Sequence, residues 1–448
     1  MSTKKSKIHK VSGQISSRRQ FLTQLGLTGT GLSCLSLPFM NAPFAKANTG
    51  SEVKRVMQFF LVGGWDTGLA TDPVIGSKAS SNIYTSSYQN YQVTQVTGKS
   101  NLQVGQGLNP AVNAFASMPT AFINGMHMEV TAHELAQNYM YSGIGSLSRS
   151  REFPAFIARI ANNTDAFPPF LAIGEPVPLG DTRDHPPLHA QSPNQLNEML
   201  NPFDTGEVPE KVVGIAQDLL KKLDQNFKSS QSTNMQDYLQ VWENSASRLG
   251  ELYARNYNLA IDDTIKDRYQ ITEVWEEFAR IPTAFLALKS GLSPFITCSL
   301  NGYDTHINHF DQHIETMNGF ASRLNTFVND LGTTPDPDDS SKMLSETTLI
   351  VILSEFCRTP DLNAGQGTDH WQSASGILMG PGVADNTIIG ATDDNANPLG
   401  WVSSSQTTLS TETEILPDHL AKAIVKKVLP SLDTSSDLGE KSLDEVFT

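Results

Sequence analysis

Acidic and histidine side chains follow three strongly apolar segments of the chain, a combination that can hold a divalent metal ion. Gly63-Gly64-Trp65-Asp66 follows the first segment, Tyr303-Asp304-Thr305-His306 the second, and Leu353 to Trp371 contains the third group. Carboxylates and imidazoles are ligands of hard or borderline cations, and no thiol cluster points to a soft metal. The candidate ligands are Asp66, Asp304, His306, Glu355, Asp369 and His370. They suffice for one ion or for two neighbouring ions serving a hydrolase.

Each candidate also has an ordinary structural interpretation. Asp66 suits an Asx turn in a glycine loop, and Asp304 suits the N-cap of a following helix. Glu355 has Arg358 nearby as an ion-pair partner, and His370 can hydrogen-bond within its own loop. Four acids and two histidines at the ends of apolar segments nevertheless favour a shared site.

Thr131 has two interpretations. With Glu134 it matches the pattern of a helix capping box, which needs no chemistry. A hydroxyl at a helix N-terminus is also a suitable nucleophile, because the free N–H groups there favour an anion. His309 and His313 are four residues apart, as helical metal ligands are, but no glutamate lies between them in a zinc-protease pattern. We expect these two histidines at the surface.

The elements that must position these residues are short buried strands separated by helices. The predicted strands cover 56–62, 121–123, 294–300, 347–353 and, more weakly, 376–380; the predicted helices cover 133–142, 152–161, 209–228, 235–289 with interruptions, 308–331 and 415–428. Strands that alternate with helices pair in parallel, so the fold class is α/β, with a mainly parallel twisted sheet between helices. The carboxyl ends of such strands form the ligand-binding edge.

Two segments between the predicted strands differ in composition from the rest. Residues 195–290 are helical in pattern and polar, and no linker flanks them, so we expect a helical insert within one domain that spans 48–448. Residues 335–341 are acidic and rich in proline and serine, which predicts a solvated loop. A loop of this kind can bind calcium, although most such loops are plain surface.

Residues 1–47 have the features of a twin-arginine signal peptide. Arg18-Arg19 lies before a weakly apolar run, four lysines precede it, and Ala45-Lys46-Ala47 forms a cleavage site. We therefore expect passage through the twin-arginine export machinery to the periplasm or the exterior. Cys34 lacks the leucine expected three residues before a lipidated cysteine, so no stable membrane anchor is expected.

Charge and cysteine content exclude several classes of protein. Cleavage after Ala47 removes seven basic and no acidic residues, which moves the formal net charge from −15 to −22. No nucleic-acid partner is expected, because phosphate backbones require a basic surface. The later cysteines are Cys298 and Cys357, each in or beside a predicted strand, which favours two small buried side chains over a disulfide.

Five stretches of the chain resemble motifs of a known family. These are Phe60-Leu61-Val62-Gly63-Gly64-Trp65-Asp66, His133-Glu134-Leu135-Ala136-Gln137, Tyr303-Asp304-Thr305-His306, Leu353-Ser354-Glu355-Phe356-Cys357-Arg358-Thr359-Pro360 and Gly367-Thr368-Asp369-His370-Trp371. Together they resemble the secreted domain-of-unknown-function 1501 family, which is similar to the alkaline phosphatase and sulfatase superfamily.

The resemblance implies a metal site at the strand ends and a role for each residue. Asp66 and Glu355 would hold one ion, whereas Asp304, His306 and His370 would hold the other. Asp369 would ligate an ion or orient His370. Arg358 would bind a substrate oxyanion or pair with an acid. The ions would be zinc or manganese, with calcium a further option.

Two departures from the family pattern bear on activity. Phe356 follows Glu355 where metallophosphatases have histidine, and Ala132 stands where the family often has a hydroxyl residue. These departures favour a protein without catalysis, whereas the grouped acids and histidines favour the function that we expect. That function is an exported metal-dependent hydrolase of a phosphate or sulfate ester, with a small molecule or a glycan as substrate. The alternative is a non-catalytic exported protein that keeps the same fold for binding.

Overall fold

The computed structural model describes residues 52–74, 91–144, 155–162, 168, 170–175, 188–200, 257, 259–400, 414–432, 438 and 441–448. The chain divides into two compact units, one of Met1–Ala42 with Asn197–Asn258 and one of Pro43–Leu196 with Leu259–Thr448. The second unit carries the sheet and the candidate site. The signal peptide and residues 201–256 of the expected insert lie outside the described residues, so the insert and the single-domain boundaries stay predictions.

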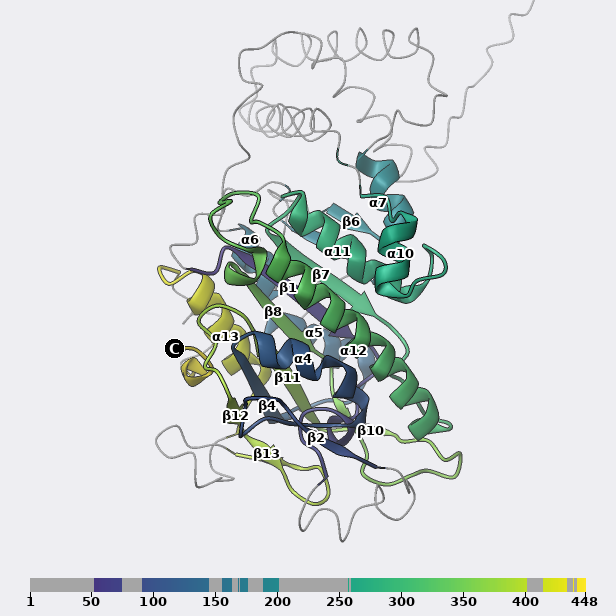
Figure 1. Ribbon diagram of the computed structural model, residues 1–448. Coiled ribbons are helices and arrows are strands. Elements are labelled where there is room, and N and C mark those ends of the chain that lie inside the picture. The colour runs from purple at the N-terminus through teal and green to yellow at the C-terminus, as the bar shows by residue number, and fades with distance from the viewer. Residues whose placement is uncertain are drawn as a thin grey trace, which may run out of the picture. The chain divides into compact units, whose positions relative to one another are not determined.

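An eight-stranded sheet forms the centre of the second unit, with strand order β12-β4-β11-β8-β1-β7-β5-β6. Every pairing is parallel except those of β11 with β4 and with β8, so β11 alone runs against the other strands (Figure 1). The strands are β1 Arg55–Leu61, β4 Thr120–His127, β5 Leu171–Ile173, β6 Leu188–Ala190, β7 Phe295–Leu300, β8 Thr348–Leu353, β11 Ser373–Met379 and β12 Thr387–Ile389. The predicted α/β class with a mainly parallel sheet is confirmed.

The central strands are buried along their whole length, which explains their continuous apolar sequences. All residues of β1, β7, β8 and β11 are buried. Cys298 lies in β7 and Cys357 follows β8, and both are buried free thiols, as expected. Burial raises the pKa of the Cys357 thiol to about 12.

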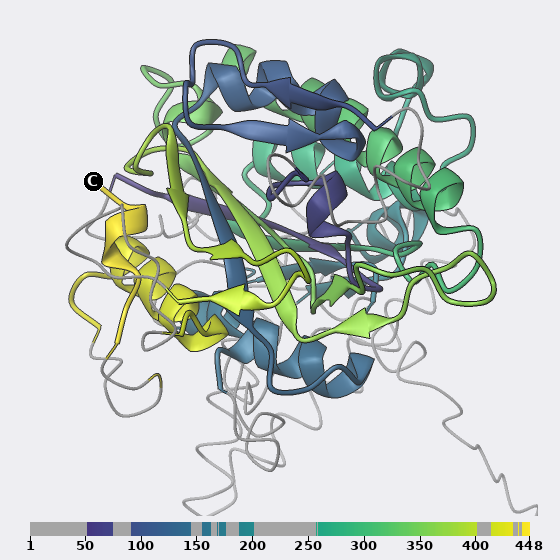
Figure 2. The same ribbon diagram turned by 90° about the horizontal axis from the view of Figure 1, so that it is seen from below.

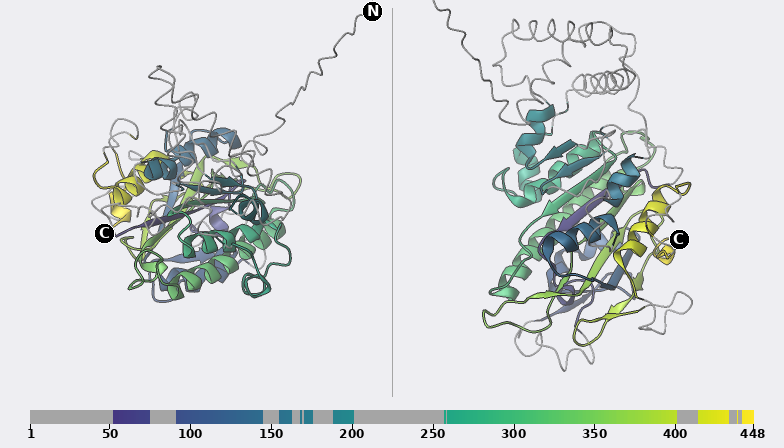
Figure 3. Two further views of the ribbon diagram at one scale, coloured as in Figure 1. Left: turned by 90° about the horizontal axis from the view of Figure 1, so that it is seen from above. Right: turned by 180° about the vertical axis from the view of Figure 1, so that it is seen from behind.

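Helices cover both faces of this sheet (Figures 2 and 3). The helix α12, His309–Thr333, contacts α11, Arg280–Lys289, and α4, Val112–Ser117. The helix α13, Pro417–Val428, contacts α5, His133–Ser142, and α6, Phe156–Asn162. The other helices are α7 Pro193–Leu200 and α10 Asp263–Tyr269, with short turns η1 Thr67–Leu69, η2 Gln106–Ala111, η3 Glu277–Ala279, η4 Leu344–Glu346 and η5 Asp444–Val446. No described helix has the length and apolar character needed to cross a membrane.

Three two-stranded ladders accompany the sheet. They pair β9, Cys357–Arg358, with β10, His370–Trp371; β2, Val93–Gln95, with β3, Gln103–Gly105; and β13, Ala391–Thr392, with β14, Pro398–Leu399. In the first ladder Arg358 stands opposite His370, so two motifs of the sequence meet directly.

The acidic loop 335–341 is less exposed than the sequence suggested. Asp336 is buried, and its carboxylate accepts a hydrogen bond of 2.5 Å from the buried Arg55 at the start of β1. Asp338 accepts a second bond from the same guanidinium. The other residues of the loop are exposed, so the predicted solvated loop is confirmed except at Asp336, which neutralises a buried arginine.

Candidate metal centre

The loops at the carboxyl ends of β1, β7, β8 and β4 meet at one edge of the sheet, since these strands run in the same direction. Glycines permit the close approach of the first two loops. Gly63 has a φ of +124°, and a Cβ at this position would lie 2.3 Å from the backbone nitrogen of Asp304. Gly64 has a φ of +83°, and its Cβ would contact the ring of Phe356 at 2.5 Å. A side chain at either position would therefore force the loops apart.

Three imidazole Nε2 atoms surround the carboxylate of Asp304. His133 Nε2 lies 3.4 Å from Oδ2 of Asp304, while His306 Nε2 and His370 Nε2 lie 3.0 and 3.2 Å from Oδ1. The ligand atoms of His133, Asp304 and His370 all lie within 4.8 Å of one another, so this cluster can hold a metal ion. His306 Nε2 is 3.0 Å from His370 Nε2 and adds a fourth candidate ligand atom.

The Nδ1 atom of each of the three histidines contacts an oxygen atom. These oxygens belong to carboxylates or to a backbone carbonyl, and an ionised carboxylate or a carbonyl accepts hydrogen bonds but donates none. His133 Nδ1 is 2.9 Å from Glu355 Oε1, His306 Nδ1 is 3.0 Å from Asp369 Oδ1, and His370 Nδ1 is 2.7 Å from the Thr131 carbonyl. In the neutral rings the proton is therefore on Nδ1, and each Nε2 presents a lone pair to the cluster. Metal-binding histidines in proteins are oriented in this way.

Burial and charge change the pKa values of the cluster. The hydrogen bond to Glu355 raises the pKa of His133, and the same negative charge makes its Nε2 a stronger ligand. Burial lowers the pKa of His370, which favours its neutral form. Burial acts to raise the pKa of Asp304, but the hydrogen bond and charge of Arg358, together with His370, lower it to about 2. Asp304 is thus an ionised carboxylate at neutral pH.

Arg358 is buried and makes four hydrogen bonds to the loops. Its guanidinium donates to the carbonyls of Gly63, Gly64 and Thr368 and, at 2.5 Å, to Oδ1 of Asp304. Of its two anticipated roles, pairing with an acid is the one present, and the acid is Asp304. Binding of a substrate oxyanion by Arg358 stays a prediction.

Glu355 and Phe356 contact histidines of the cluster and restrict the positions of their rings. The buried Glu355 accepts hydrogen bonds from the backbone nitrogen of Gly63 at 2.8 Å and from Gln137 at 3.2 Å, besides its contact with His133. The ring of Phe356 lies 5.0 Å from the ring of His133 and 4.4 Å from that of His370, measured between centroids. Phe356 therefore packs against two candidate ligands.

Asp66 lies in a different, buried group. Its Oδ1 accepts from the backbone nitrogen of Gly68 at 2.8 Å, and its Oδ2 lies 2.7 Å from Nε2 of His309. His309 and His313 are fully buried, so their expected surface position was wrong. Burial, with smaller contributions from the charges of His309 and Arg358, holds the pKa of His313 well below its usual value.

The helix α5 begins at His133 with Ala132 at its N-cap, and no side chain caps it. The predicted capping box of Thr131 and Glu134 is therefore wrong. Thr131 contributes to the cluster through its carbonyl, which contacts His370, and its role as nucleophile stays a prediction.

The six predicted ligands separate into three positions. Asp304, His306 and His370 meet at the cluster, while Glu355 and Asp369 each contact one of its histidines. Among the residues that the structure describes, one group of three or more possible ligands occurs, and Asp66 and Glu355 are not in it. His133 was missed as a ligand. It follows a predicted strand, which was a usable signal, but the stretch around it was interpreted as a helix cap.

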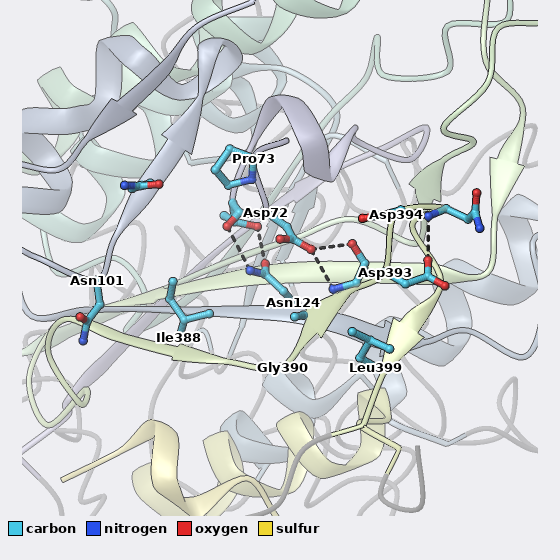
Figure 4. A pocket seen from close by; sticks show the side chains of 14 residues that line it. Asp72, Pro73, Asn101, Asn124, Ile388, Gly390, Asp393, Asp394 and Leu399 are labelled. Atoms are coloured by element: carbon cyan, nitrogen blue, oxygen red, sulfur yellow. Dashed lines mark hydrogen bonds between the residues drawn. The ribbon is translucent and has the colours of Figure 1, made fainter. Parts of the chain in front are cut away.

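A cavity of about 730 Å³ opens beside β4, β13 and β14 (Figure 4). Its lining includes Asp72, Asn101, Asn124, Asp393 and Asp394 and contains no lysine, arginine or histidine among the described residues. The carboxylates in this lining repel the anionic group of a phosphate or sulfate ester.

The chain is similar to several solved structures at low identity. The crystal structure of Ps i-CgsB in complex with k-i-k-neocarrahexaose is 9% identical over 87% of this chain and 74% of that chain, with a TM-score of 0.33. A variant of TAB5 alkaline phosphatase with bound Mg is 12% identical over 77% and 94%, with a TM-score of 0.31. The alkaline phosphatase from the Antarctic bacterium TAB5 is 11% identical over the same shares, with a TM-score of 0.30. At such scores no function follows from these similarities.

No curated protein matches this chain. A family model matches residues 53–400, which covers the first and last strands of the sheet and every residue of the cluster. Its description is "Protein of unknown function (DUF1501)". The chain therefore belongs to the DUF1501 family.

Proposed function

We propose that the protein is an exported metal-dependent hydrolase of a phosphate or sulfate ester, with one divalent ion bound by His133, Asp304, His306 and His370. The observation that carries the proposal is the direction of the three imidazole rings. Each donates through Nδ1 to an oxygen and presents Nε2 to the Asp304 carboxylate. A cation at their centre satisfies three lone pairs and a negative charge together.

The donor set favours zinc or manganese over calcium. Three imidazole nitrogens and one carboxylate suit a borderline cation, whereas calcium binds almost entirely to oxygen ligands. Three neutral imidazoles and one carboxylate leave positive charge on the ion, which suits an anionic ester.

The surrounding residues keep these ligands in place. Glu355 and Asp369 hold the rings of His133 and His306 through Nδ1, and the Thr131 carbonyl does the same for His370. Arg358 fixes one oxygen of Asp304. When bound, the ion would polarise an ester oxygen and lower the pKa of a coordinated water. Thr131, whose backbone carbonyl contacts His370, is the proposed alternative nucleophile, because a hydroxyl close to a helix N-terminus is suited to attack.

The choice of a phosphate or sulfate ester rests on the motif resemblance. The resemblance does not define whether the rest of the substrate is a glycan or a small molecule. The second candidate is a non-catalytic binding protein. Two observations favour this alternative: Phe356 packs against His133 and His370, and Ala132 occupies the N-cap of α5.

We further propose that residues 1–47 direct export by the twin-arginine route. In cell fractionation, replacing both Arg18 and Arg19 by lysine should leave the protein in the cytoplasm, whereas replacing Lys4 and Lys5 by arginine should not. Export of the double-lysine variant at the wild-type level would contradict this proposal.

Metal content of the purified protein tests the centre. The wild type should contain about one zinc or manganese per chain, and His133→Ala and Asp304→Asn should lose it. His127→Ala is the matched control, since this histidine ends β4 and pairs with Glu414 outside the cluster. A folded wild type that binds neither metal would exclude the proposal.

Hydrolysis of aryl phosphates and aryl sulfates tests the reaction. Activity that requires the metal supports the hydrolase. A metal-loaded protein that hydrolyses neither aryl phosphates nor aryl sulfates, and neither sugar phosphates nor sugar sulfates, would favour the non-catalytic binding protein. Thr131→Ala should abolish activity if Thr131 is the nucleophile, and should leave most of it if water attacks.

A further inference from the structure

Four residues adjacent to the candidate metal centre form a closed ring of hydrogen bonds. Asp66, Thr305, His309 and His313 are all buried. His313 Nε2 lies 2.8 Å from the backbone nitrogen of Asp66, and His313 Nδ1 lies 3.0 Å from Oγ1 of Thr305. The same hydroxyl is 2.7 Å from His309 Nδ1, and His309 Nε2 is 2.7 Å from Oδ2 of Asp66.

With both imidazoles neutral and the Thr305 hydroxyl donating to His309, one fixed donor sets the remaining protons of this ring. The backbone N–H of Asp66 can only donate, so His313 Nε2 accepts and the proton of a neutral His313 is on Nδ1. That N–H donates to Thr305, whose hydroxyl proton then goes to His309 Nδ1. His309 carries its proton on Nε2 and donates it to the Asp66 carboxylate. The two histidines thus hold opposite tautomers.

This ring is attached to two of the three segments that supply the proposed metal ligands, those of Asp304 with His306 and of His370. Thr305 lies between Asp304 and His306 in the sequence. Thr368, which precedes Asp369 and His370, places its hydroxyl 3.1 Å from His309 Nδ1, and its backbone nitrogen donates to the carbonyl of Thr305 at 3.1 Å. The histidines lie in the first turns of α12, a 25-residue helix, which is a rigid support.

We infer that His309 and His313 are positioning residues, and that the Asp66–His309–Thr305–His313 ring fixes the loops of Asp304, His306 and His370 in the geometry needed to bind the ion. The inference rests on the proposed function, because it assigns the ring a role in metal binding. By this inference His309, His313 and Asp66 position the metal ligands, and none of the three binds the ion itself.

The two tautomers can be measured without any metal. Selective ¹⁵N labelling of histidine followed by long-range ¹H–¹⁵N correlation distinguishes protonated from bare ring nitrogens. In the metal-free wild type, His309 should be protonated on Nε2 and His313 on Nδ1. The reverse tautomers, or a doubly protonated ring at neutral pH, would overturn the inference.

A matched pair of variants tests the positioning role. Thr305→Val keeps the shape of the side chain but removes the hydroxyl, whereas Thr305→Ser keeps the hydroxyl. In titration calorimetry with Zn²⁺ or Mn²⁺, the valine variant should bind about 10–100-fold more weakly, as is typical for groups that orient metal ligands, and the serine variant within about threefold of wild type. Unchanged affinity in the valine variant would refute the positioning role.

The ring nitrogens of His306 and His370 provide a readout that needs no bound metal. Their ¹⁵N shifts should move in Thr305→Val and stay in Thr305→Ser, and identical shifts in both variants would contradict the inference. A wild type that binds no metal but shows the expected tautomers and shifts would instead exclude the proposed function. If the valine variant does not fold, Thr305→Ala, which also removes the hydroxyl but adds no methyl group in its place, replaces it under the same criteria.

Discussion

His306 Nε2 lies 3.0 Å from His370 Nε2, although the Nδ1 atom of each ring already contacts an oxygen acceptor. Two lone pairs at this separation repel each other unless a cation or a shared proton lies between them. Asp304, whose low pKa keeps it ionised, faces the same point. The close approach of the two Nε2 atoms therefore fits the proposal of a cation bound at the cluster.

Replacing Glu355 by glutamine should weaken metal binding by about 10–100-fold while leaving the fold intact, because the neutral amide orients His133 without raising its basicity. Titration calorimetry would measure the change. Gln137→Ala serves as the control. It removes another hydrogen bond to the same Glu355 oxygen but keeps the carboxylate charge beside His133. Equal losses in the two variants would mean that Glu355 acts only through packing.

Gly63→Ala should destabilise the fold by about 1–3 kcal/mol, the usual cost of a residue forced into unfavourable backbone geometry, and should also weaken metal binding. The added Cβ would press on the backbone nitrogen of Asp304 at 2.3 Å. Gly332→Ala, in α12 with nothing within 4 Å of its Cβ, should instead be neutral or stabilise by up to about 1 kcal/mol. Urea unfolding of both variants would check this contrast.

Asp336→Ala should lower the free energy of unfolding by about 3–5 kcal/mol, because it leaves the buried Arg55 without its buried partner. Asp338→Ala should cost less than about 1 kcal/mol, since the side chain of Asp338 is 43% exposed and water replaces it readily. Chemical denaturation measures both values. A larger loss for Asp338 would show that the exposed carboxylate is the more important partner of Arg55.

The ion pair of Lys99 with Asp385 should make stability depend on acid pH. Burial opposes ionisation of Asp385, but the hydrogen bond from Lys99 and the backbone of Thr120 lower its pKa below the usual value. A carboxyl whose pKa is lower in the folded state contributes stability above its unfolded pKa, and this contribution disappears as the pH falls through the folded pKa.

Urea unfolding at pH 6 and at pH 3 would test the Lys99–Asp385 pair. Asp385→Asn should show a smaller loss of stability between the two pH values than the wild type does. The effect should be modest, because the side chain of Asp385 is 53% exposed. An equal loss in both proteins would assign the pH dependence to other groups.

The sheet and the sheet edge of the site were predictable from the sequence because they depend on local patterns. Short runs of apolar residues such as Thr348–Leu353 can be buried only as central strands, and polar residues that follow parallel strands must meet at one edge. That argument gathered all six candidate ligands at one edge, and the motif resemblance then assigned Asp304, His306 and His370 to one ion. It could not show whether Thr131 or Ala132 is the N-cap of the helix, since a capping pattern does not determine a backbone conformation.

The partner of each polar group was decided by the tertiary structure, because contacts across more than 200 residues have no local signature. His133 reaches Glu355 across 222 positions, and Asp66 reaches His309 across 243. His309 and His313 of α12 can be buried because Thr305, Thr368 and Asp66 provide hydrogen-bond partners for their nitrogens. The sequence by itself determined which chemistry was available at the edge; long-range packing determined which of those side chains face the cluster and which hold it in place.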